Sequence, residues 1–333
     1  MLKLEDIRHL HIEASSLCNA RCPLCPRNVF GYPHNLGYTE NSLSYELITR
    51  SLSPQFLSQI TSMLLNGNFG DFTSNLEILP ILRYFREHSS MSMLISTNGS
   101  ARNREFWEDL ANLGNIEIEF CLDGLEDTHH LYRQDTDWNK IIQNAQWFME
   151  AGGKATWKMI KFKHNEHQRE ACEKLSKELG FYKFLFNDHG RDQGPAFNRD
   201  GSLSHVIGGY DGFKNAQEVI DWLNTDSSYR LPQRDLYDHV DCEAKRMDSI
   251  YIAADGKVYP CCWLGFNPTT YHKGWVGMLN QQIATLVKDN DLHENSLEKC
   301  IGWFEDVERS WAIESYKEGR LMQCDISCGR CKK

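Results

Sequence analysis

The chain has 333 residues, of which 41% are hydrophobic and 25% are charged, and its net charge at pH 7 is −10. This size and composition predict a globular protein with one large α/β domain and a smaller second unit. The negative charge argues against nucleic acid or an anionic membrane surface as a partner, because both favour a basic protein face.

No segment of the sequence has the character of a membrane span or a secretory signal. Met1–Leu10 carries four charged residues and lacks the apolar core of a signal peptide, and no apolar run reaches about 18 residues. We therefore expect a cytoplasmic protein. In a reducing cytosol, the 12 cysteines are not expected to form disulfides. Their grouping into two separate clusters indicates two metal sites.

The first half of the chain alternates between short apolar runs and segments with helical periodicity. Strands are predicted at Leu10–Ala14, Ser62–Leu65, Ser92–Ser96, Ile116–Leu122, Ala155–Phe162 and Tyr182–Phe186. Helices are predicted near Leu43–Gln59, Leu76–Glu87, Arg104–Leu113, Trp138–Ala151 and Glu166–Leu179. Strands that alternate with helices pair in parallel through right-handed crossovers. The prediction is an α/β fold, a partial (β/α)6 TIM-like barrel over residues 1–187, with its chemistry at the carboxyl ends of the strands.

The alternation ends after Phe186, and the rest of the chain divides into two parts. Residues 188–240 are interpreted as an insertion that lines the substrate site, and residues 241–333 as a C-terminal domain. The predicted elements are a long loop at 187–210, a helix at Ala216–Leu223, a hairpin of 248–253 with 257–261 around Ala254–Gly256, and helices near Gln282–Lys288 and Leu297–Glu318.

Three cysteines lie within eight residues directly after the first predicted strand: Cys18, Cys22 and Cys25. Their soft sulfur ligands suit either zinc or an iron–sulfur cluster. Three thiolates are one fewer than a closed structural site needs, which leaves one metal position open to a substrate. The alternative is a structural zinc site that takes its fourth ligand from elsewhere in the chain.

The C-x3-C-x2-C spacing in the loop after the first strand of a βα barrel resembles the signature of the radical S-adenosylmethionine (SAM) enzymes. One position departs from the commonest pattern, because Leu24 stands where an aromatic residue often precedes the third cysteine. The resemblance implies that Cys18, Cys22 and Cys25 hold a [4Fe–4S] cluster whose open iron binds SAM.

Three further segments, each after a successive strand, extend this resemblance to residues 1–186. Gly67–Asp71 is similar to the Gly-Gly-Glu segment that holds the SAM amino group, with Asp71 in place of glutamate. Ser96–Gly99 resembles the polar strand end that meets the SAM carboxylate and ribose. Each segment also has a plain structural interpretation as a turn or loop. The SAM contacts implied here are Gly67, Asn68, Gly70, Asp71, Ser96 and Asn98.

The third segment combines Cys121–Gly124 with Tyr132 and Arg133. It is similar to a Ser-x-Asp-Gly…Tyr-Arg pattern in peptide-modifying members of the family, in which the arginine pairs with the SAM carboxylate. Cys121 occupies the usual serine position. The resemblance therefore implies Cys121 and Arg133 as SAM contacts, whereas a solvated helix charge is the alternative for Arg133.

The C-terminal part contains a second group of cysteines. Cys242 and Cys261 have the spacing C-x13-G-x4-C around the predicted hairpin, which resembles the start of a SPASM or Twitch domain. The cysteines are too few for a full SPASM domain, so the single-cluster Twitch type over residues 241–333 is the better match. Its auxiliary [4Fe–4S] cluster needs four thiolates when it is fully bound by protein, and the predicted ligands are Cys242, Cys261, Cys324 and Cys328.

Three other cysteines in this part compete for the same role. Cys331 is a close competitor, because Cys328-x2-Cys331 also chelates well. Cys262 is expected to point away from its neighbour along a strand, and Cys300 to lie in the core. The alternative for the whole region is a structural zinc knot.

The resemblance implies a function but not a substrate. SAM would be cleaved reductively to a 5′-deoxyadenosyl radical, which abstracts hydrogen from a peptide, a protein side chain or a small polar molecule. The auxiliary cluster would accept an electron in an oxidoreductase-type reaction, or would instead be a structural anchor or a substrate ligand. A flavodoxin- or ferredoxin-like protein would supply the reductant. His189 and Asp192 in the predicted loop are weak candidates for catalysis. The alternatives are a non-catalytic zinc-binding or scaffold protein and a radical SAM methyltransferase.

Overall fold

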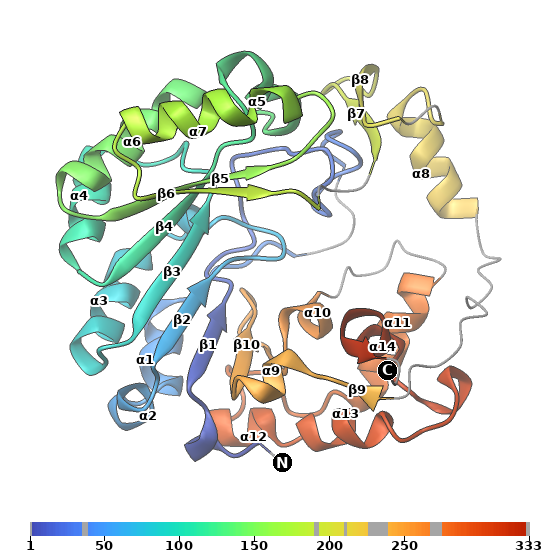
Figure 1. Ribbon diagram of the computed structural model, residues 1–333. Coiled ribbons are helices and arrows are strands. Elements are labelled where there is room, and N and C mark those ends of the chain that lie inside the picture. Colours follow the sequence, from blue (N-terminus) through green and yellow to red (C-terminus); the bar gives the residue numbers. More distant parts are fainter. Residues whose placement is uncertain are drawn as a thin grey trace.

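The computed structural model describes residues 2–34, 39–189, 193–209, 212–225, 239–266 and 275–330. Its main feature is a curved sheet with the strand order β11-β10-β1-β2-β3-β4-β5-β6 (Figure 1). These strands are β1 (His9–Ile12), β2 (Ser62–Leu65), β3 (Ser92–Thr97), β4 (Ile116–Cys121), β5 (Lys154–Ile160), β6 (Lys183–Asn187), β10 (Ser249–Ile252) and β11 (Val258–Tyr259). Strands β1 to β6 are all parallel to their neighbours, which confirms the predicted fold class.

Helices α1 to α7 lie on the outer side of this sheet (Figure 1). The α-helices are α1 (Tyr45–Ser51), α2 (Pro54–Ser58), α3 (Ile78–His88), α4 (Arg104–Asn112), α5 (Glu126–Tyr132), α6 (Trp138–Glu150), α7 (Arg169–Glu178), α8 (Ala216–Thr225), α9 (Glu243–Arg246), α10 (Cys262–Gly265), α11 (Trp275–Leu286), α12 (Leu297–Ile301), α13 (Phe304–Ser310) and α14 (Met322–Cys328). Short 3-10 turns are η1 (Leu4–Asp6), η2 (Phe72–Ser74), η3 (Glu166–Gln168) and η4 (Tyr316–Glu318).

The core lies between the sheet and its outer helices. Phe120 on β4 and Trp157 on β5 are fully buried there, together with Trp107 of α4 and Phe148 of α6. Because side chains alternate along a strand, the residues between these apolar positions point to the opposite, inner side of the curved sheet. Polar side chains such as Glu119 occupy that inner side, so the sequence pattern itself separates the core from the site.

Two predicted helices are interrupted in the structure. The helix predicted at Leu43–Gln59 is divided into α1 and α2, because Ser53 accepts a hydrogen bond from the N–H of Phe56 and Pro54 begins a new helix. The helix predicted at Leu297–Glu318 ends first at Gly302, which separates α12 from α13.

The prediction of an unstructured loop over residues 187–210 is wrong for most of its length. Strands β7 (Gly194–Phe197) and β8 (Leu203–Ile207) form an antiparallel hairpin, closed by the N–H of Asn198, which donates to the C=O of Ser202 at 2.9 Å. Gly, Asp and Asn are common in turns, and the many such residues in this segment favoured a loop over the two short strands, which pair with each other.

The C-terminal hairpin joins the main sheet. Strand β10 pairs in parallel with β1, with His9 opposite Ser249, and β11 follows as an antiparallel edge strand. Another pair, β9 (His239–Val240) and β12 (Gly329–Arg330), lies apart from the sheet. Among the residues that the structure describes, none of the helices combines the length and apolar character that crossing a membrane requires.

Candidate iron–sulfur and SAM site

The first three cysteines lie together in the loop of residues 15–28, hereafter the cluster loop, at the carboxyl end of β1. The N–H of Cys25 donates to the C=O of Cys22 at 3.0 Å and closes a turn between them. Asn28 Nδ2 donates to the same C=O at 3.2 Å. Cys22 is buried, and all three cysteines contact a small apolar cluster that includes Tyr132. The cluster loop thus holds the three thiols against the same apolar cluster.

Several N–H groups donate to the sulfur atoms of this loop. Asn98 Nδ2 lies 3.4 Å from Cys18 Sγ, the backbone N–H of Ala20 lies 3.3 Å from the same sulfur, and Arg133 Nη1 lies 3.9 Å from Cys22 Sγ. Two of the predicted cofactor residues, Asn98 and Arg133, therefore contact cluster-loop cysteines directly. Hydrogen bonds of this kind favour anionic sulfur and set the potential of a bound cluster.

Burial without a metal disfavours the anionic form of the Cys18 thiol. It raises the pKa of Cys18, with further contributions from the nearby Asp71 and Cys22. A bound iron would reverse this effect, because a metal ion stabilises the thiolate that coordinates it. The three thiols and the N–H groups that face them therefore fit a [4Fe–4S] cluster.

An ion pair holds Arg133 in place. Arg133 Nε lies 2.6 Å from Asp123 Oδ2, and the Asp123 side chain is fully buried. The other carboxylate oxygen accepts the N–H of Ile160 at 2.6 Å, and the guanidinium lies over the Tyr132 ring. Asp123 follows β4, while Arg133 follows α5, a helix that the sequence analysis did not predict. The ion pair uses the Nε edge of Arg133 and leaves Nη1 against Cys22.

The segment Gly67–Asp71 follows β2 and packs directly on the cluster loop. A Cβ atom at position 70 would lie 1.9 Å from the carbonyl oxygen of Ser15 and 2.7 Å from that of Leu17. The N–H of Asp71 donates to the same Leu17 oxygen at 2.9 Å. Glycine is therefore required at position 70 by the close approach of two backbone segments. The contact with SAM that the resemblance implies for Gly70 stays a prediction.

Asp71 is surrounded by donors from its own chain. Its Oδ1 accepts from the N–H and hydroxyl of Thr73 at 3.0 and 2.6 Å, and its Oδ2 accepts from the hydroxyl of Thr97 at 2.9 Å and the N–H of Asn98 at 2.8 Å. The carboxylate thus connects the β2 loop to the end of β3 and positions Asn98 beside Cys18. Its expected contact with the SAM ammonium stays a prediction.

Ser96 belongs to a polar group on the inner side of the sheet. Its hydroxyl donates to Glu119 Oε2, which also accepts from Lys158 Nζ at 2.7 Å. Cys121 lies on the same side of β4, and burial raises the pKa of its thiol. The sequence analysis missed Glu119 and Lys158, although their position between outward-facing apolar residues was the available signal.

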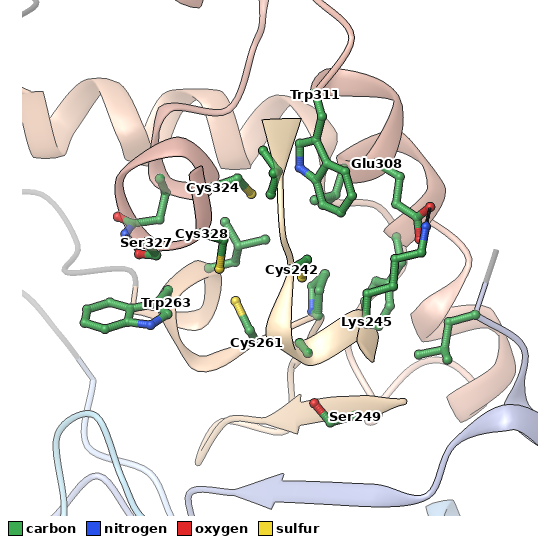
Figure 2. Close-up of a pocket in the computed structure, with 18 residues that line it drawn as sticks. Cys242, Lys245, Ser249, Cys261, Trp263, Glu308, Trp311, Cys324, Ser327 and Cys328 are labelled. Atoms are coloured by element: carbon green, nitrogen blue, oxygen red, sulfur yellow. Dashed lines mark hydrogen bonds and ion pairs between the residues drawn. The ribbon is translucent and has the colours of Figure 1, made fainter. Parts of the chain in front are cut away.

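The four predicted auxiliary ligands line one pocket, together with apolar residues such as Leu264 and Phe304 (Figure 2). Cys242 directly precedes α9, and Cys261 directly precedes α10. The remaining pair lies one helical turn apart on α14. The four are Cys242, Cys261, Cys324 and Cys328.

The pairing of β9 with β12 explains why cysteines far apart in the sequence meet here. Cys242 follows β9 and Cys328 precedes β12, and the N–H of Asp241 donates to the C=O of Cys328 at 2.9 Å. Burial raises the pKa of Cys324 to about 12, with Cys242 and Cys328 adding to the effect. Burial and the nearby Cys324 likewise raise the pKa of Cys261.

The competing cysteines lie elsewhere or are not described. Cys300 is fully buried in α12 within the main core, and Cys262 does not line the pocket. Cys331 lies outside the described residues. Within the described ranges, no three His, Cys, Asp or Glu side chains are arranged to hold a single metal ion together.

The candidate catalytic residues have less support. His189 is exposed after β6, where its N–H donates to Asn187 Oδ1 at 3.2 Å. Asp192 lies outside the described residues. A catalytic role for either stays a prediction.

Comparison with solved structures shows a fold similar to that of two proteins with bound S-adenosylmethionine. SuiB of Streptococcus suis bound to S-adenosylmethionine aligns over 98% of this chain and 73% of its own, with a TM-score of 0.56 and 17% identity. The enzyme anSMEcpe with bound AdoMet aligns over 97% of this chain and 89% of its own, with a TM-score of 0.55 and 15% identity.

One curated protein also resembles the sequence. It is the tungsten-containing aldehyde ferredoxin oxidoreductase cofactor-modifying protein of Pyrococcus furiosus, which is 25% identical over 119 residues. The match spans 36% of this chain and 32% of that protein, about a third of each. No family model matches the chain.

Proposed function

We propose that this chain is a radical SAM enzyme that carries an auxiliary cluster and oxidises a peptide or protein side chain. The observation that carries the proposal is the convergence of Asn98, after β3, and Arg133, after α5, on the sulfur atoms of Cys18 and Cys22. A residue that only forms a turn, or a charge that only faces solvent, is not expected to contact a cysteine sulfur atom. This arrangement supports a site built around anionic sulfur.

A [4Fe–4S] cluster with bound SAM supplies the hard chemistry, which is one-electron cleavage to methionine and a 5′-deoxyadenosyl radical. The residues of the chain would bind the cluster and stabilise its negative charge. Cys18, Cys22 and Cys25 would hold three irons and leave the fourth open. Asn98 and Arg133 donate to the sulfurs and favour the anionic cluster.

The auxiliary site is proposed to hold a second cluster through Cys242, Cys261, Cys324 and Cys328. In a cubane, each thiolate binds a different iron, so the four sulfur atoms are spread more widely than around one ion. The shared pocket and the raised pKa values of Cys261 and Cys324 are consistent with four thiols gathered for that purpose. Its proposed role is to accept the electron left on the substrate after hydrogen abstraction.

A peptide substrate is supported by two of the similar structures. One is SuiB bound to the precursor peptide SuiA, and another is anSMEcpe with AdoMet and the Cp18Cys peptide. In this chain, the ion pair of Glu119 and Lys158 gives the inner side of the sheet a polar character suited to a substrate with hydrogen-bonding groups. A small polar molecule is the second candidate, and a flavodoxin- or ferredoxin-like protein is the proposed electron donor.

Anaerobic reconstitution with iron and sulfide tests this proposal. We expect about eight irons per chain and formation of 5′-deoxyadenosine from SAM after reduction with dithionite. Cys22→Ala should abolish SAM cleavage, whereas Cys328→Ala should retain it and lose the auxiliary iron. Formation of 5′-deoxyadenosine by Cys22→Ala would refute the proposal, and a methylated product would favour methyltransfer instead of oxidation.

A further inference from the structure

The segment Gly67–Asp71, hereafter the SAM segment, lies between the two cysteine sites. On one side it packs on Ser15 and Leu17 of the cluster loop, directly before Cys18. On the other side, Asn68 Nδ2 donates to the C=O of Cys262 at 2.9 Å. Residues 260–266, hereafter the auxiliary loop, contain this carbonyl and the predicted ligand Cys261. The SAM segment therefore contacts both loops.

Two buried side chains complete the connection. The hydroxyl of Tyr251 on β10 donates to Glu13 Oε2 at 2.9 Å and accepts from Asn68 Nδ2 at 3.2 Å. Glu13 Oε1 in turn accepts the backbone N–H groups of Phe69 at 2.7 Å and Gly70 at 3.1 Å. One continuous hydrogen-bonded network thus runs from the auxiliary loop to the backbone of the SAM segment.

The two central side chains of this network are buried, whereas Asn68, Phe69 and Cys262 are partly exposed. Glu13 is 2% exposed and Tyr251 is fully buried. Burial raises the pKa of Glu13 and of Tyr251. In such surroundings a lost hydrogen bond is not replaced by water, so each bond restrains its partners strongly. The ring of Phe69 also stacks on Phe266, with 5.5 Å between centroids and 9° between planes.

We propose that Tyr251 and Glu13 are positioning residues that couple occupancy of the auxiliary site to the affinity of the SAM segment for SAM. The inference rests on the proposed function. A ligand bound at Cys261 restrains the auxiliary loop, and through Asn68 and Tyr251 it holds the SAM segment in one conformation. Coupling of this kind is reciprocal, so SAM also stabilises the auxiliary site. Tyr251 and Glu13 would act through Asn68 and through the backbone of Phe69 and Gly70.

The first test removes one hydroxyl. Tyr251→Phe keeps the ring that packs on His11 but loses both hydroxyl contacts. In the reconstituted enzyme, we expect the Kd and KM for SAM to rise about fivefold, as for one buried hydrogen bond, with kcat at saturating SAM unchanged. Tyr84→Phe is the matched control, because its buried hydroxyl bonds the C=O of Leu52 far from the site. An unchanged Kd in Tyr251→Phe would overturn the proposal.

A double-mutant cycle tests the direction of the coupling. Cys328→Ala, which removes an auxiliary ligand, should itself raise the Kd for SAM. Adding Tyr251→Phe to Cys328→Ala should then have little further effect, because the connection is already broken. Fully additive effects of the two substitutions would show that Tyr251 acts without the auxiliary site and would refute the inference.

Two further measurements separate positioning from a general loss of structure. Glu13→Gln keeps an oxygen for the N–H groups of Phe69 and Gly70 and should retain SAM affinity, whereas Glu13→Ala should not. In the SAM-free reconstituted enzyme, exchange of these two amide hydrogens should be faster in Tyr251→Phe. Equal exchange would count against the proposal. Failure of the wild-type enzyme to bind SAM would refute the proposed function instead.

Discussion

Substitution of Gly70 by alanine tests the contact between the SAM segment and the cluster loop. The added Cβ would lie 1.9 Å from the carbonyl oxygen of Ser15, 2.6 Å from its carbonyl carbon and 2.7 Å from the oxygen of Leu17. All three are backbone atoms, so no side-chain rotation relieves the clash. Because real Cβ atoms essentially never come closer than 3.0 Å to another heavy atom, the two segments must separate by roughly 1 Å or more, the scale on which misplacement costs about 100-fold in catalysis.

We expect Gly70→Ala to lower the free energy of unfolding by about 2–4 kcal/mol, because the separation also breaks the bond from Asp71 N–H to Leu17. Urea denaturation measures this value, and 5′-deoxyadenosine formation should fall about 100-fold. Gly209→Ala is the matched control, since its Cβ would meet only Gln193 at 3.7 Å. A Gly70→Ala variant as stable as Gly209→Ala would refute the assigned contact.

The other predictions concern burial, charge and ligation. Arg133→Met leaves Asp123 buried without its ion-pair partner, so urea denaturation should show a loss of about 3–5 kcal/mol, and a loss below 1 kcal/mol would contradict the buried pair. Burial lowers the pKa of His129 to about 4, so the folded protein binds fewer protons than the unfolded chain below pH 6.5. Stability should therefore fall as the pH decreases from about 6.5 toward 4, and His129→Gln should reduce the slope by about one proton; an unchanged slope would reject the assignment. Cys324→Ala should lose about four irons per chain, whereas Cys300→Ala should lose none; iron analysis that reverses this result would reject the ligand set.

The strands of the sheet could be predicted because their signal is local. Each of β1 to β6 is a short apolar run next to a helical segment, and burial on one side of the sheet requires that pattern. Helix α5 was missed because its seven residues, with His129 and His130 near its end, lack an apolar period. The strands β7 and β8 were missed because turn residues surround them and because their stabilising contacts, such as the hydrogen bond from the N–H of Phe197 to the C=O of Phe30, come from distant parts of the chain.

The features of the candidate site also fall into two groups, those that the sequence indicated and those that it did not. The spacing of Cys18, Cys22 and Cys25 is a property of eight consecutive residues, so the sequence alone indicated a three-thiolate loop. The resemblance also named Gly70, but as a contact of SAM. Its close approach to the backbone of the cluster loop was found only in the structure. The surroundings of Asp71 could not be predicted, since its donors come from a turn and from a different strand.

Only the tertiary structure decided how the two cysteine groups relate to each other. The pairing of β10 with β1 joins distant parts of the chain, and the pairing of β9 with β12 joins two segments of its C-terminal part. Through these pairings, Tyr251 meets Glu13 and Asn68 meets the auxiliary loop. Such contacts do not affect the hydrophobic periodicity of the sequence, because they depend on which strands pair in the folded protein. The sequence determined which cysteines are candidates for the sulfur chemistry, and the fold determined that the SAM segment lies between the two cysteine groups.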